Sequence, residues 1–417
     1  MKETRTVEYK ESIDTNSFLK TVSAFANYSG GQIIFGIADD GTIQGISDPI
    51  HSTLSLENKI DDSLKPVPAY SLEINKDSTI TLHVEKGPFT PYLYKGKAYK
   101  RNDTATIEVN WLELNRLVLE GMNQTYEEQV SFLQDLTFVE LNKEFCQILG
   151  IEKITDDILK TLGLYTNDKF NNAAALLADH NRYLGIDIIR YGKNINELMD
   201  RNTDDNVSIF RMYHNAIAFF DKYYTYEEIK GNQRMKKELI PNLAYREVIA
   251  NALIHRLWDI QSRIRISMFE DRIEVTSPGG LPAGIDEEEY LNGQVSFLRN
   301  PIIGNIFFRL GYIEMFGSGI RRIKESYRNS LSEPEFKIFN NSITVVLPIL
   351  INTTEVTDDE QIILNFMSIQ KLSRTEIGRM TDFNKNKTIR LLNSLINKGL
   401  ISKSGSGPNT KYSLSKK

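Results

Sequence analysis

The stretch Arg246–Arg256, which reads REVIANALIHR, decides how the rest of the chain is interpreted. Read as a helix, it places Glu247, Asn251 and His255 four residues apart on one face, beside an apolar stripe suited to a core. The amide oxygen of Asn251 is a neutral hard ligand for Mg²⁺, and the carboxylate of Glu247 can hold or deprotonate a water molecule. An ordinary amphipathic helix with solvated polar residues explains the stretch equally well, so the stretch alone leaves both interpretations open.

The same residues resemble the N-box of the GHKL ATPases, the family of gyrase, heat-shock chaperone, histidine kinase and mismatch-repair ATPases. That motif has a Glu, then Asn-Ala four residues later and often a His after it, as in Glu247, Asn251 and His255. The resemblance implies ATP and Mg²⁺ as cofactors, with Asn251 on the metal and Glu247 orienting the attacking water. It also implies a GHKL-like α/β sandwich, which we expect over 241–351, and a homo-oligomer.

Glycine-rich turns follow this helix. A predicted β-hairpin, 263–269 with 273–276, runs into Ser277-Pro-Gly-Gly280, where residues lacking Cβ let backbone N–H groups approach an anion. Further on, Gly317-Ser-Gly319 opens a predicted helix, whose N-terminus favours phosphate. In this order the helix and the two turns resemble a divergent GHKL branch that is labelled as related to RecG and is often met beside an AlbA-like domain. The residues expected to bind the nucleotide are Asn251, His255, Gly279, Gly280, Gly317 and Gly319.

The chain departs from the GHKL pattern at one point. The usual family has Asp-x-Gly-x-Gly, whose Asp binds the adenine amine, whereas Ser277-Pro-Gly-Gly280 has no Asp. Nucleotide binding with hydrolysis, binding without hydrolysis, and a nucleotide-free scaffold therefore stay open. The sequence also lacks Gly-x-x-x-x-Gly-Lys-Ser/Thr, so we do not expect a P-loop helicase motor.

Composition is that of an ordinary soluble protein, with 41% hydrophobic and 25% charged residues. The 417 residues are enough for roughly three domains. A single cysteine, Cys146, excludes an internal disulfide and favours a reducing compartment. The start lacks the apolar run of a signal peptide, and no apolar run approaches the roughly 20 residues of a membrane span. We therefore expect a cytoplasmic protein, whose net charge of −5 argues against uniform nucleic-acid coating.

The first 115 residues predict a small α/β unit. A helical pattern over 18–26 leads into Gly30-Gly31, followed by a buried strand at 32–37 and further strands at 71–74, 79–84 and 98–100. The segment resembles the Schlafen-type AlbA-like domain, a nucleic-acid-binding module. The marks that carry this resemblance are Val7-Glu-Tyr-Lys10, Ala26-Asn27, Gly30-Gly31, Phe35-Gly-Ile37, Asp39 and Ala98-Tyr-Lys-Arg-Asn-Asp103.

Aromatic and basic residues alternate near the end of this segment. Cations contact phosphates and flat rings stack on unpaired bases, so the pattern fits DNA or RNA. A plain edge hairpin whose exposed lysines block aggregation is the alternative. The residues expected to contact nucleic acid here are Lys10, Lys95, Lys97, Tyr99, Lys100 and Arg101.

The AlbA-like resemblance also raises a nuclease alternative. Some Schlafen proteins cut RNA with three carboxylates, and the matching positions are Glu3, Glu8 and Asp39. Clustered carboxylates can hold divalent metals that stabilise the attacking and leaving oxygens at a phosphorus. Acidic residues near a chain start are more often solvated, and relatives that do not cleave can share these positions.

The last segment, 355–417, has the pattern of a winged helix-turn-helix. A capping box from Ser373 to Glu376 starts the second of three predicted helices, and Gly405-Ser-Gly407 marks the wing. Residues 358–417 hold 11 Lys and Arg against 5 Asp and Glu, a local positive charge that suits phosphate backbones. The residues expected at base edges, near the start of the third helix, are Lys385, Asn386, Lys387 and Arg390. A protein-binding winged helix is the alternative.

Together these patterns predict an α/β (α+β) chain: an AlbA-like domain at 1–115, a helix-and-strand connector at 116–240, the GHKL-like core and the winged helix. The leading hypothesis is a DNA-binding transcriptional regulator with a nucleotide-responsive core. A Schlafen-like metal-dependent nuclease, perhaps acting in phage defence, and a ligand-free DNA-binding scaffold are the alternatives.

Overall fold

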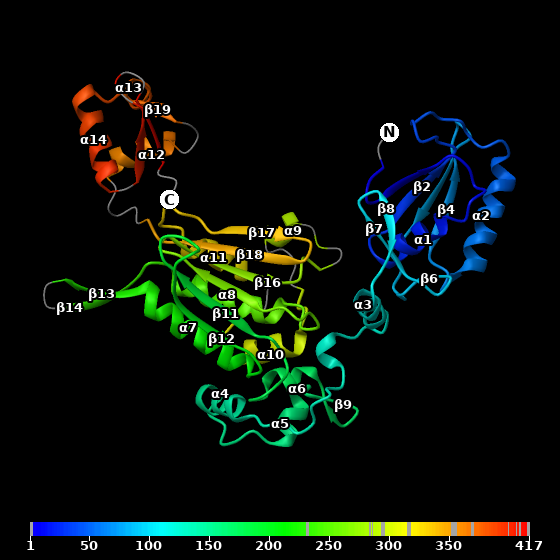
Figure 1. Cartoon of the computed structure of the whole chain (residues 1–417), viewed down its shortest axis with the longest axis horizontal. Helices are drawn as coiled ribbons and strands as arrows, with labels where there is room; N and C mark the ends of the chain where they lie inside the picture. The colour runs from blue at the N-terminus through cyan, green and yellow to red at the C-terminus, as the bar shows by residue number, and fades with distance from the viewer. Residues whose placement is uncertain are drawn as a thin grey trace.

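The computed structural model describes residues 3–230, 233–282, 285, 287–292, 297–314, 318–351, 357–367, 371–398, 400–405, 407 and 410–414. The chain folds into three parts, each with its own hydrophobic core, arranged along the molecule in Figure 1. The sequence-based expectation of a mixed α/β fold is confirmed.

The N-terminal domain is a four-stranded sheet in the order β1-β2-β5-β4, with helix α1 packed against it. Strand β1 runs parallel to β2, while β5 is antiparallel to both of its neighbours. Strands β7 and β8 form a separate hairpin beside α1. The strands predicted at 32–37, 71–74, 79–84 and 98–100 are confirmed to within two residues. The elements are β1 (Val7–Lys10), α1 (Phe18–Asn27), β2 (Gly31–Phe35), α2 (Pro49–Ser63), β3 (Leu64–Lys65), β4 (Tyr70–Ile74), β5 (Ile80–Val84), β6 (Leu93–Tyr94), β7 (Tyr99–Asn102) and β8 (Ala105–Glu108).

Gly31 allows α1 and β2 to pack this closely. A Cβ on Gly31 would lie 2.7 Å from the ring of Phe25 and 2.7 Å from the carbonyl oxygen of Thr6. Any side chain would therefore separate the helix from the sheet, so this glycine has a packing role.

Helix α3 (Trp111–Gly121) leads from this domain to the rest of the chain. Arg116 on α3 makes a two-pronged ion pair with Asp259 of the central domain, with nitrogen–oxygen distances of 2.7 and 2.9 Å. The connector then forms α4 (Val139–Leu149), α5 (Asp156–Thr161), α6 (Asn172–Leu177) and the short elements η1 (Tyr126–Glu128), β9 (Tyr165–Thr166) and β10 (Lys169–Phe170). Cys146 is half-buried on α4.

The central domain is a six-stranded sheet in the order β12-β11-β15-β16-β18-β17, with helices packed on one face. Along β15, Ile264, Ile266 and Met268 are buried while Arg265 is exposed, so one face meets the helices and the other meets water. The strands are β11 (Ile186–Tyr191), β12 (Leu198–Asp204), β15 (Ile264–Met268), β16 (Arg272–Pro278), β17 (Glu335–Phe339) and β18 (Ser342–Pro348). The helices are α7 (Ile209–Tyr224), α8 (Asn242–His255), α9 (Glu287–Asn292), α10 (Pro301–Arg309) and α11 (Gly319–Ser326).

Most of the segment 116–240, from η1 onward, shares the core of this domain, whereas α3 packs on the N-terminal domain through Leu117. Strand β11 pairs in parallel with β15, and side chains of α4, α6 and α7 share one hydrophobic core with α8 and α10. The β-hairpin predicted at 263–276 is confirmed as β15 and β16. A boundary near 240 therefore does not separate two cores.

Helix α8 is buried on almost all sides. Its buried residues include Val248, Ile249 and Ala252 and also Glu247. Helix α8 is therefore not an ordinary amphipathic helix with all its polar residues in solvent. The polar face of α8 is enclosed by other elements of the domain.

The C-terminal segment has a small core of its own. Helices α12 (Asp358–Met367), α13 (Arg374–Thr381) and α14 (Lys385–Asn397) pack with a sheet in the order β19-β21-β20. The predicted capping box is present, since Ser373 and Glu376 bond to each other's backbone N–H groups. The strands are β19 (Leu372–Ser373), β20 (Ile401–Ser404) and β21 (Lys411–Leu414). Among the described residues, no helix has both the length and the apolar character of a membrane span.

Candidate nucleotide and nucleic-acid sites

Helix α8 brings Glu247 and Asn251 together as the sequence predicted. Asn251 Nδ2 lies 3.4 Å from Oε1 of Glu247, so the carboxylate and the amide form one polar pair. Glu247 is only 5% exposed, while Asn251 is half-buried. Burial raises the pKa of Glu247 above the ordinary value for a glutamate, against the lowering effect of the nearby Arg322.

The start of α11 lies directly on this pair. A Cβ on Gly319 would lie 2.6 Å from Oε1 of Glu247 and 2.9 Å from Nδ2 of Asn251, so the ends of these two side chains would have to shift for any other residue. Arg322, one turn into α11, has Nη1 3.7 Å from Oε2 of Glu247. A helix N-terminus and a guanidinium both attract anions. In this arrangement the anion at the start of α11 is the protein's own carboxylate.

The second glycine turn lies at the other end of α8. Arg299 donates from Nη1 to the carbonyl of His255 at 2.6 Å and from Nη2 to the carbonyl of Gly280 at 2.9 Å. The N–H of Gly279 donates to the carbonyl of Asn341 at 2.9 Å, so this N–H is not free for a phosphate here. Burial, and then Arg299, lower the pKa of His255 to about 4, so its imidazole is neutral at pH 7.

The two turns are separated along α8. Gly319 lies against Glu247 and Asn251, whereas Arg299 links Gly280 to His255. His255 is eight residues beyond Glu247, which corresponds to about 12 Å along the helix. A mononucleotide is long enough to span that distance, with phosphates at one end and base at the other. Gly317, the remaining expected nucleotide residue, lies outside the described residues.

The polar groups at this site match only the metal and phosphate end of a magnesium nucleotide. One carboxylate and one amide oxygen suit the metal and phosphate end. The turn 277–280 supplies no carboxylate for an adenine amine, and the start of α11 must move off Glu247 before a phosphate can take its place.

In the N-terminal domain, several expected nucleic-acid residues line a hollow of about 460 Å³. Lys95, Lys97 and Tyr99 meet there with three residues the sequence analysis did not single out: Asn16, Ser17 and Lys20 at the start of α1. The sequence feature that could have pointed to this place is Lys20, which lies in the first turn of a helix with no acidic residue. The exposed ammonium groups of Lys20, Lys95 and Lys97 are suited to phosphates.

The aromatic rings in this region are core residues. Tyr94 and Tyr99 are 5% and 7% exposed, and their rings lie in the domain core, 6.5 Å apart between centroids. Lys97 pairs with Glu108 at 2.7 Å, and Lys100 pairs with Glu113. The hollow therefore offers cations for a phosphate backbone and not exposed rings for stacking on bases.

Arg101 and Lys10 have an internal role. Both pair with Glu8, which is 4% exposed; Lys10 Nζ lies 2.6 Å from Oε1, and Arg101 Nη1 pairs with Oε2. Thr21 Oγ1 also donates to Oε2 of Glu8 at 2.7 Å. This network joins β1, α1 and β7, so its cations are not available to nucleic acid.

The three carboxylates of the nuclease alternative are not brought together. Glu8 is neutralised by its two bases, Glu3 accepts from the N–H of Tyr9 at 3.1 Å, and Asp39 is exposed in a turn. Across the described residues, no group of three His, Cys, Asp or Glu side chains is placed to hold a metal ion.

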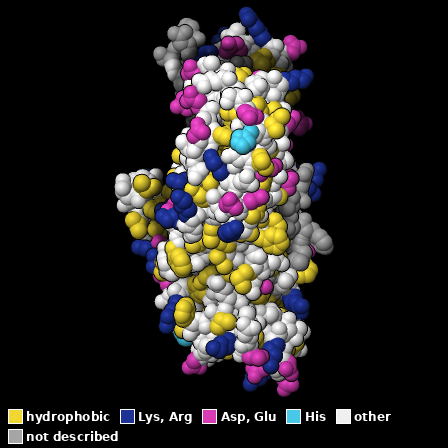
Figure 2. All heavy atoms as spheres, turned by 90° about the vertical axis from the view of Figure 1, so that its right-hand side faces the viewer, with side chains coloured by type: hydrophobic (Ala, Val, Ile, Leu, Met, Phe, Trp, Pro, Cys, Tyr) yellow, Lys and Arg dark blue, Asp and Glu magenta, His cyan; other side chains and the backbone are white. Residues whose placement is uncertain are grey.

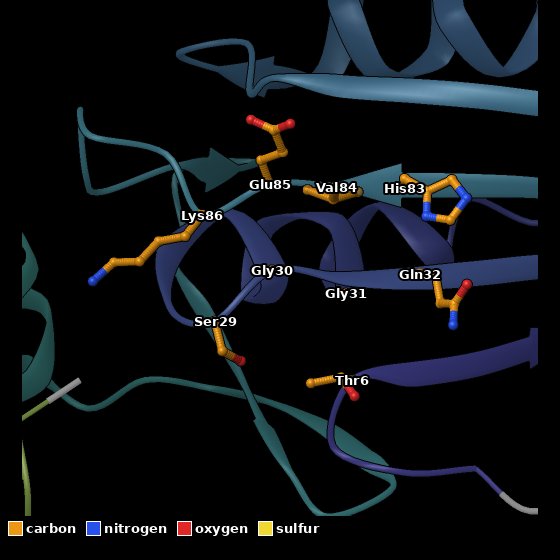
Figure 3. Close-up of a pocket in the computed structure, with 9 residues that line it drawn as sticks. All are labelled: Thr6, Ser29, Gly30, Gly31, Gln32, His83, Val84, Glu85 and Lys86. Atoms are coloured by element: carbon orange, nitrogen blue, oxygen red, sulfur yellow. The ribbon is translucent and has the colours of Figure 1, made fainter. Parts of the chain in front are cut away.

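A second, more open hollow of about 570 Å³ lies at the end of the N-terminal sheet. Figure 3 shows that its floor is the backbone of residues 29–32 and 83–86, with Glu85 and Lys86 pointing apart. Lys86 pairs with Glu120 of α3 at 2.7 Å. The lining combines one acid, Glu85, with one lysine, Lys86, so this hollow has less positive charge to offer a phosphate than the lysine-lined one.

Charge on the molecular surface is mixed. On the side of the molecule seen in Figure 2, Lys and Arg side chains lie beside Asp and Glu side chains over the whole face. Nucleic-acid contacts on this side must therefore be local, as the net charge of −5 already indicated.

In the C-terminal segment, Lys385, Asn386 and Arg390 are exposed on α14. Lys387 differs, because its Nζ pairs with Asp359 at 2.8 Å and lies 3.9 Å from the ring centroid of Phe383. The buried face of α14 consists of Thr388, Leu391, Leu392 and Leu395.

Comparison with known proteins identifies two of these parts. The family described as "Schlafen, AlbA_2" matches residues 3–110, and "Putative ATP-dependent DNA helicase recG C-terminal" matches residues 261–347. The chain thus joins a Schlafen AlbA_2 domain to a RecG C-terminal, ATPase-like domain, the combination expected from the sequence. The second match contains both glycine turns and begins after Glu247 and Asn251.

Solved structures also resemble this chain, and one of them matches nearly its whole length. The DIP2311 protein from Corynebacterium diphtheriae is 18% identical, with a TM-score of 0.50 over 99% of this chain and 92% of that one. This likeness concerns the fold alone. No curated protein matches the chain. The two domain matches together indicate nucleic-acid binding.

Proposed function

We propose that the N-terminal domain binds DNA or RNA through backbone phosphates held in the hollow of Lys20, Lys95 and Lys97. The observation that carries the proposal is a hollow lined by three exposed lysines, of which Lys97 also pairs with Glu108, in a domain matched to Schlafen AlbA_2. Because the neighbouring rings are buried, contacts to the sugar-phosphate backbone dominate and base preference is weak.

The test is binding of labelled single-stranded and duplex oligonucleotides by fluorescence anisotropy over a range of salt concentrations. Lys20→Ala with Lys95→Ala should weaken binding for every sequence and reduce the salt slope by about 1.4 to 1.8, since each lost phosphate contact removes roughly 0.7 to 0.9. Lys76→Ala, at an exposed lysine in the turn between β4 and β5, is the matched control. An unchanged slope in the double variant refutes the assignment.

We propose, second, that the central domain binds a magnesium nucleotide with Asn251 at the metal and phosphate end of α8. The adjacency of Glu247, Asn251 and Gly319 supports this, together with the ATPase-like match. When bound, Mg²⁺ would neutralise phosphate charge, while Glu247 would orient a water molecule. Hydrolysis is a separate proposal from binding, because the turn 277–280 lacks the Asp that binds adenine in the usual family.

Thermal unfolding with and without ATP and Mg²⁺ tests nucleotide binding. A ligand at 100 times its Kd stabilises the folded state by about 2.7 kcal/mol, and Asn251→Ala should abolish that shift. Gln361→Ala, at a half-buried position of α12 outside the central domain, is the control. If millimolar nucleotide leaves the wild-type transition unchanged, this proposal fails and the nucleic-acid proposal stands alone.

We propose, third, that the C-terminal segment is a winged helix that reads duplex DNA, and that the whole protein is a transcriptional regulator. The exposed Lys385, Asn386 and Arg390 at the start of α14 support a recognition helix. Lys385→Ala with Arg390→Ala should weaken duplex binding without lowering the melting temperature. Full affinity in that variant would favour a protein-binding winged helix.

A further inference from the structure

The hairpin of β13 (Thr225–Lys230) and β14 (Gln233–Glu238) extends from the central domain as an arm. Figure 1 shows it projecting beyond the end of α7, away from the sheet. The strands pair antiparallel from Thr225–Glu238 to Lys230–Gln233. At the base, Thr225 Oγ1 donates to the carbonyl of Asp221 at 2.6 Å, and Lys236 pairs with the Asp221 carboxylate at 3.2 Å.

A lone two-stranded ribbon is at best marginally stable in water, and its outer edges tend to pair with other chains. This arm nevertheless carries large apolar side chains into solvent, since Ile229 is 69% exposed and Tyr226 is 50% exposed. Ile229 and Tyr226 lie on opposite faces of the ribbon, so a surface packed on the face of Ile229 would cover Ile229 alone.

The charges of the arm argue against nucleic acid as that surface. Its described side chains include three acids, Glu227, Glu228 and Glu238, and three bases, Arg234, Lys236 and Lys237. Arg234 lies 3.4 Å from Glu227, and Lys237 lies 3.8 Å from Glu228. Over 225–238 the sequence holds four bases, counting Lys230, and three acids, which is close to neutral, whereas a ribbon that follows phosphates carries a clear excess of bases.

The same charges are complementary to themselves. On one face of the arm, Glu227 lies opposite Lys236 and Ile229 lies opposite Arg234, so an acidic and apolar strand runs beside a basic one. A two-fold axis parallel to the strands would place β13 of each copy over β14 of the other at the same level. Glu227 would then face Lys236 of the second copy, and Ile229 would cover the alkyl stem of its Arg234.

We infer that this arm is a docking surface for the arm of a second copy of the chain, forming an isologous dimer. The assignment rests on the position, exposure and charge pattern of the arm and is independent of the ligands proposed above.

Sedimentation equilibrium of the full chain tests the inference. Wild-type protein should dimerise. Glu227→Lys makes the face basic and Lys236→Glu makes it acidic, so each variant alone should dimerise at least about tenfold more weakly. An equimolar mixture of the two variants should regain the dimer, because the lysines of one copy then face the glutamates of the other.

The mixture separates docking from simple damage to the hairpin. Within each variant, residues 227 and 236 of the same arm remain like-charged, so a hairpin that failed to form would not be repaired by mixing. Arg328→Glu, at a side chain that is 75% exposed, is the control and should dimerise like wild type. A monomeric wild type, single variants that dimerise normally, or a mixture no tighter than its components would each overturn the inference.

Discussion

Replacing Glu8 by alanine should destabilise the N-terminal domain strongly, because it removes the acid from a buried ion pair. The side chains of Glu8 and Arg101 are 5% and 4% exposed, and the carboxylate also binds Lys10 and Thr21. Lys10 is 28% exposed and can turn to water once its partner is lost. Arg101 lies inside the domain, and its Nε already has no hydrogen-bond partner.

The size of the effect follows from the charge left behind. Removing one member of a buried pair typically costs about 3–5 kcal/mol, whereas an exposed pair contributes at most about 1 kcal/mol. For a domain of this size, about 3 kcal/mol lowers the melting temperature by roughly 12 °C or more. Lys10→Ala should lower it by no more than about 8 °C at the same scale.

Differential scanning calorimetry of the full chain measures these shifts in the N-terminal transition. Replacing both partners, by Glu8→Met with Arg101→Met, should recover most of the loss, because no charge stays buried. The reasoning is refuted if Glu8→Ala changes the transition by less than about 2 °C, or if the double replacement is as unstable as the single one. Nuclease assays on Glu8→Ala need this control, since lost cleavage would otherwise report lost folding.

Three further predictions concern the central domain. Gly319→Ala should lower the stability of the central domain by about 1–3 kcal/mol in urea unfolding, because the new methyl group meets Glu247. Adding Glu247→Ala to the same chain should remove most of that loss, and stability losses that simply add would count against the contact. Arg116→Ala should loosen α3 from Asp259 and speed its amide hydrogen exchange, and unchanged exchange would mean that the ion pair does not hold α3. The stability of wild type relative to His255→Gln should fall as pH drops from 6.5 towards 4, by up to about 3 kcal/mol, since the folded-state pKa of His255 is depressed to about 4. Buried carboxyls with raised pKa values, such as Glu127, act alike in both chains, so the difference between the two urea-midpoint profiles isolates His255, and a difference that does not change with pH would contradict the assignment.

The elements that the sequence predicted well are those specified by local pattern. Helix α8, the β15–β16 hairpin and the capping box of α13 each depend on residues within about a dozen positions of one another. The pairing of β11 with β15 joins residues more than seventy positions apart, and periodicity does not reveal such a partner. The connector was therefore interpreted as separate from the domain whose sheet it completes.

The candidate sites follow the same division. Glu247 and Asn251 were found because one helical turn sets their spacing. The pairing of Glu8 with Arg101 spans 93 positions, and the alternation of tyrosine and lysine concealed that the rings are buried. Arg322 and Lys20 were missed because a single cation acquires meaning only from its neighbours in the fold.

The burial of α8 limits how its polar pair can change. Most residues of that helix are packed against other elements, so replacing them to re-aim Glu247 or Asn251 would disrupt the domain interior. The turns at its two ends carry fewer such constraints. Divergence among relatives around this polar pair should therefore accumulate in those turns, while the helix itself stays nearly invariant.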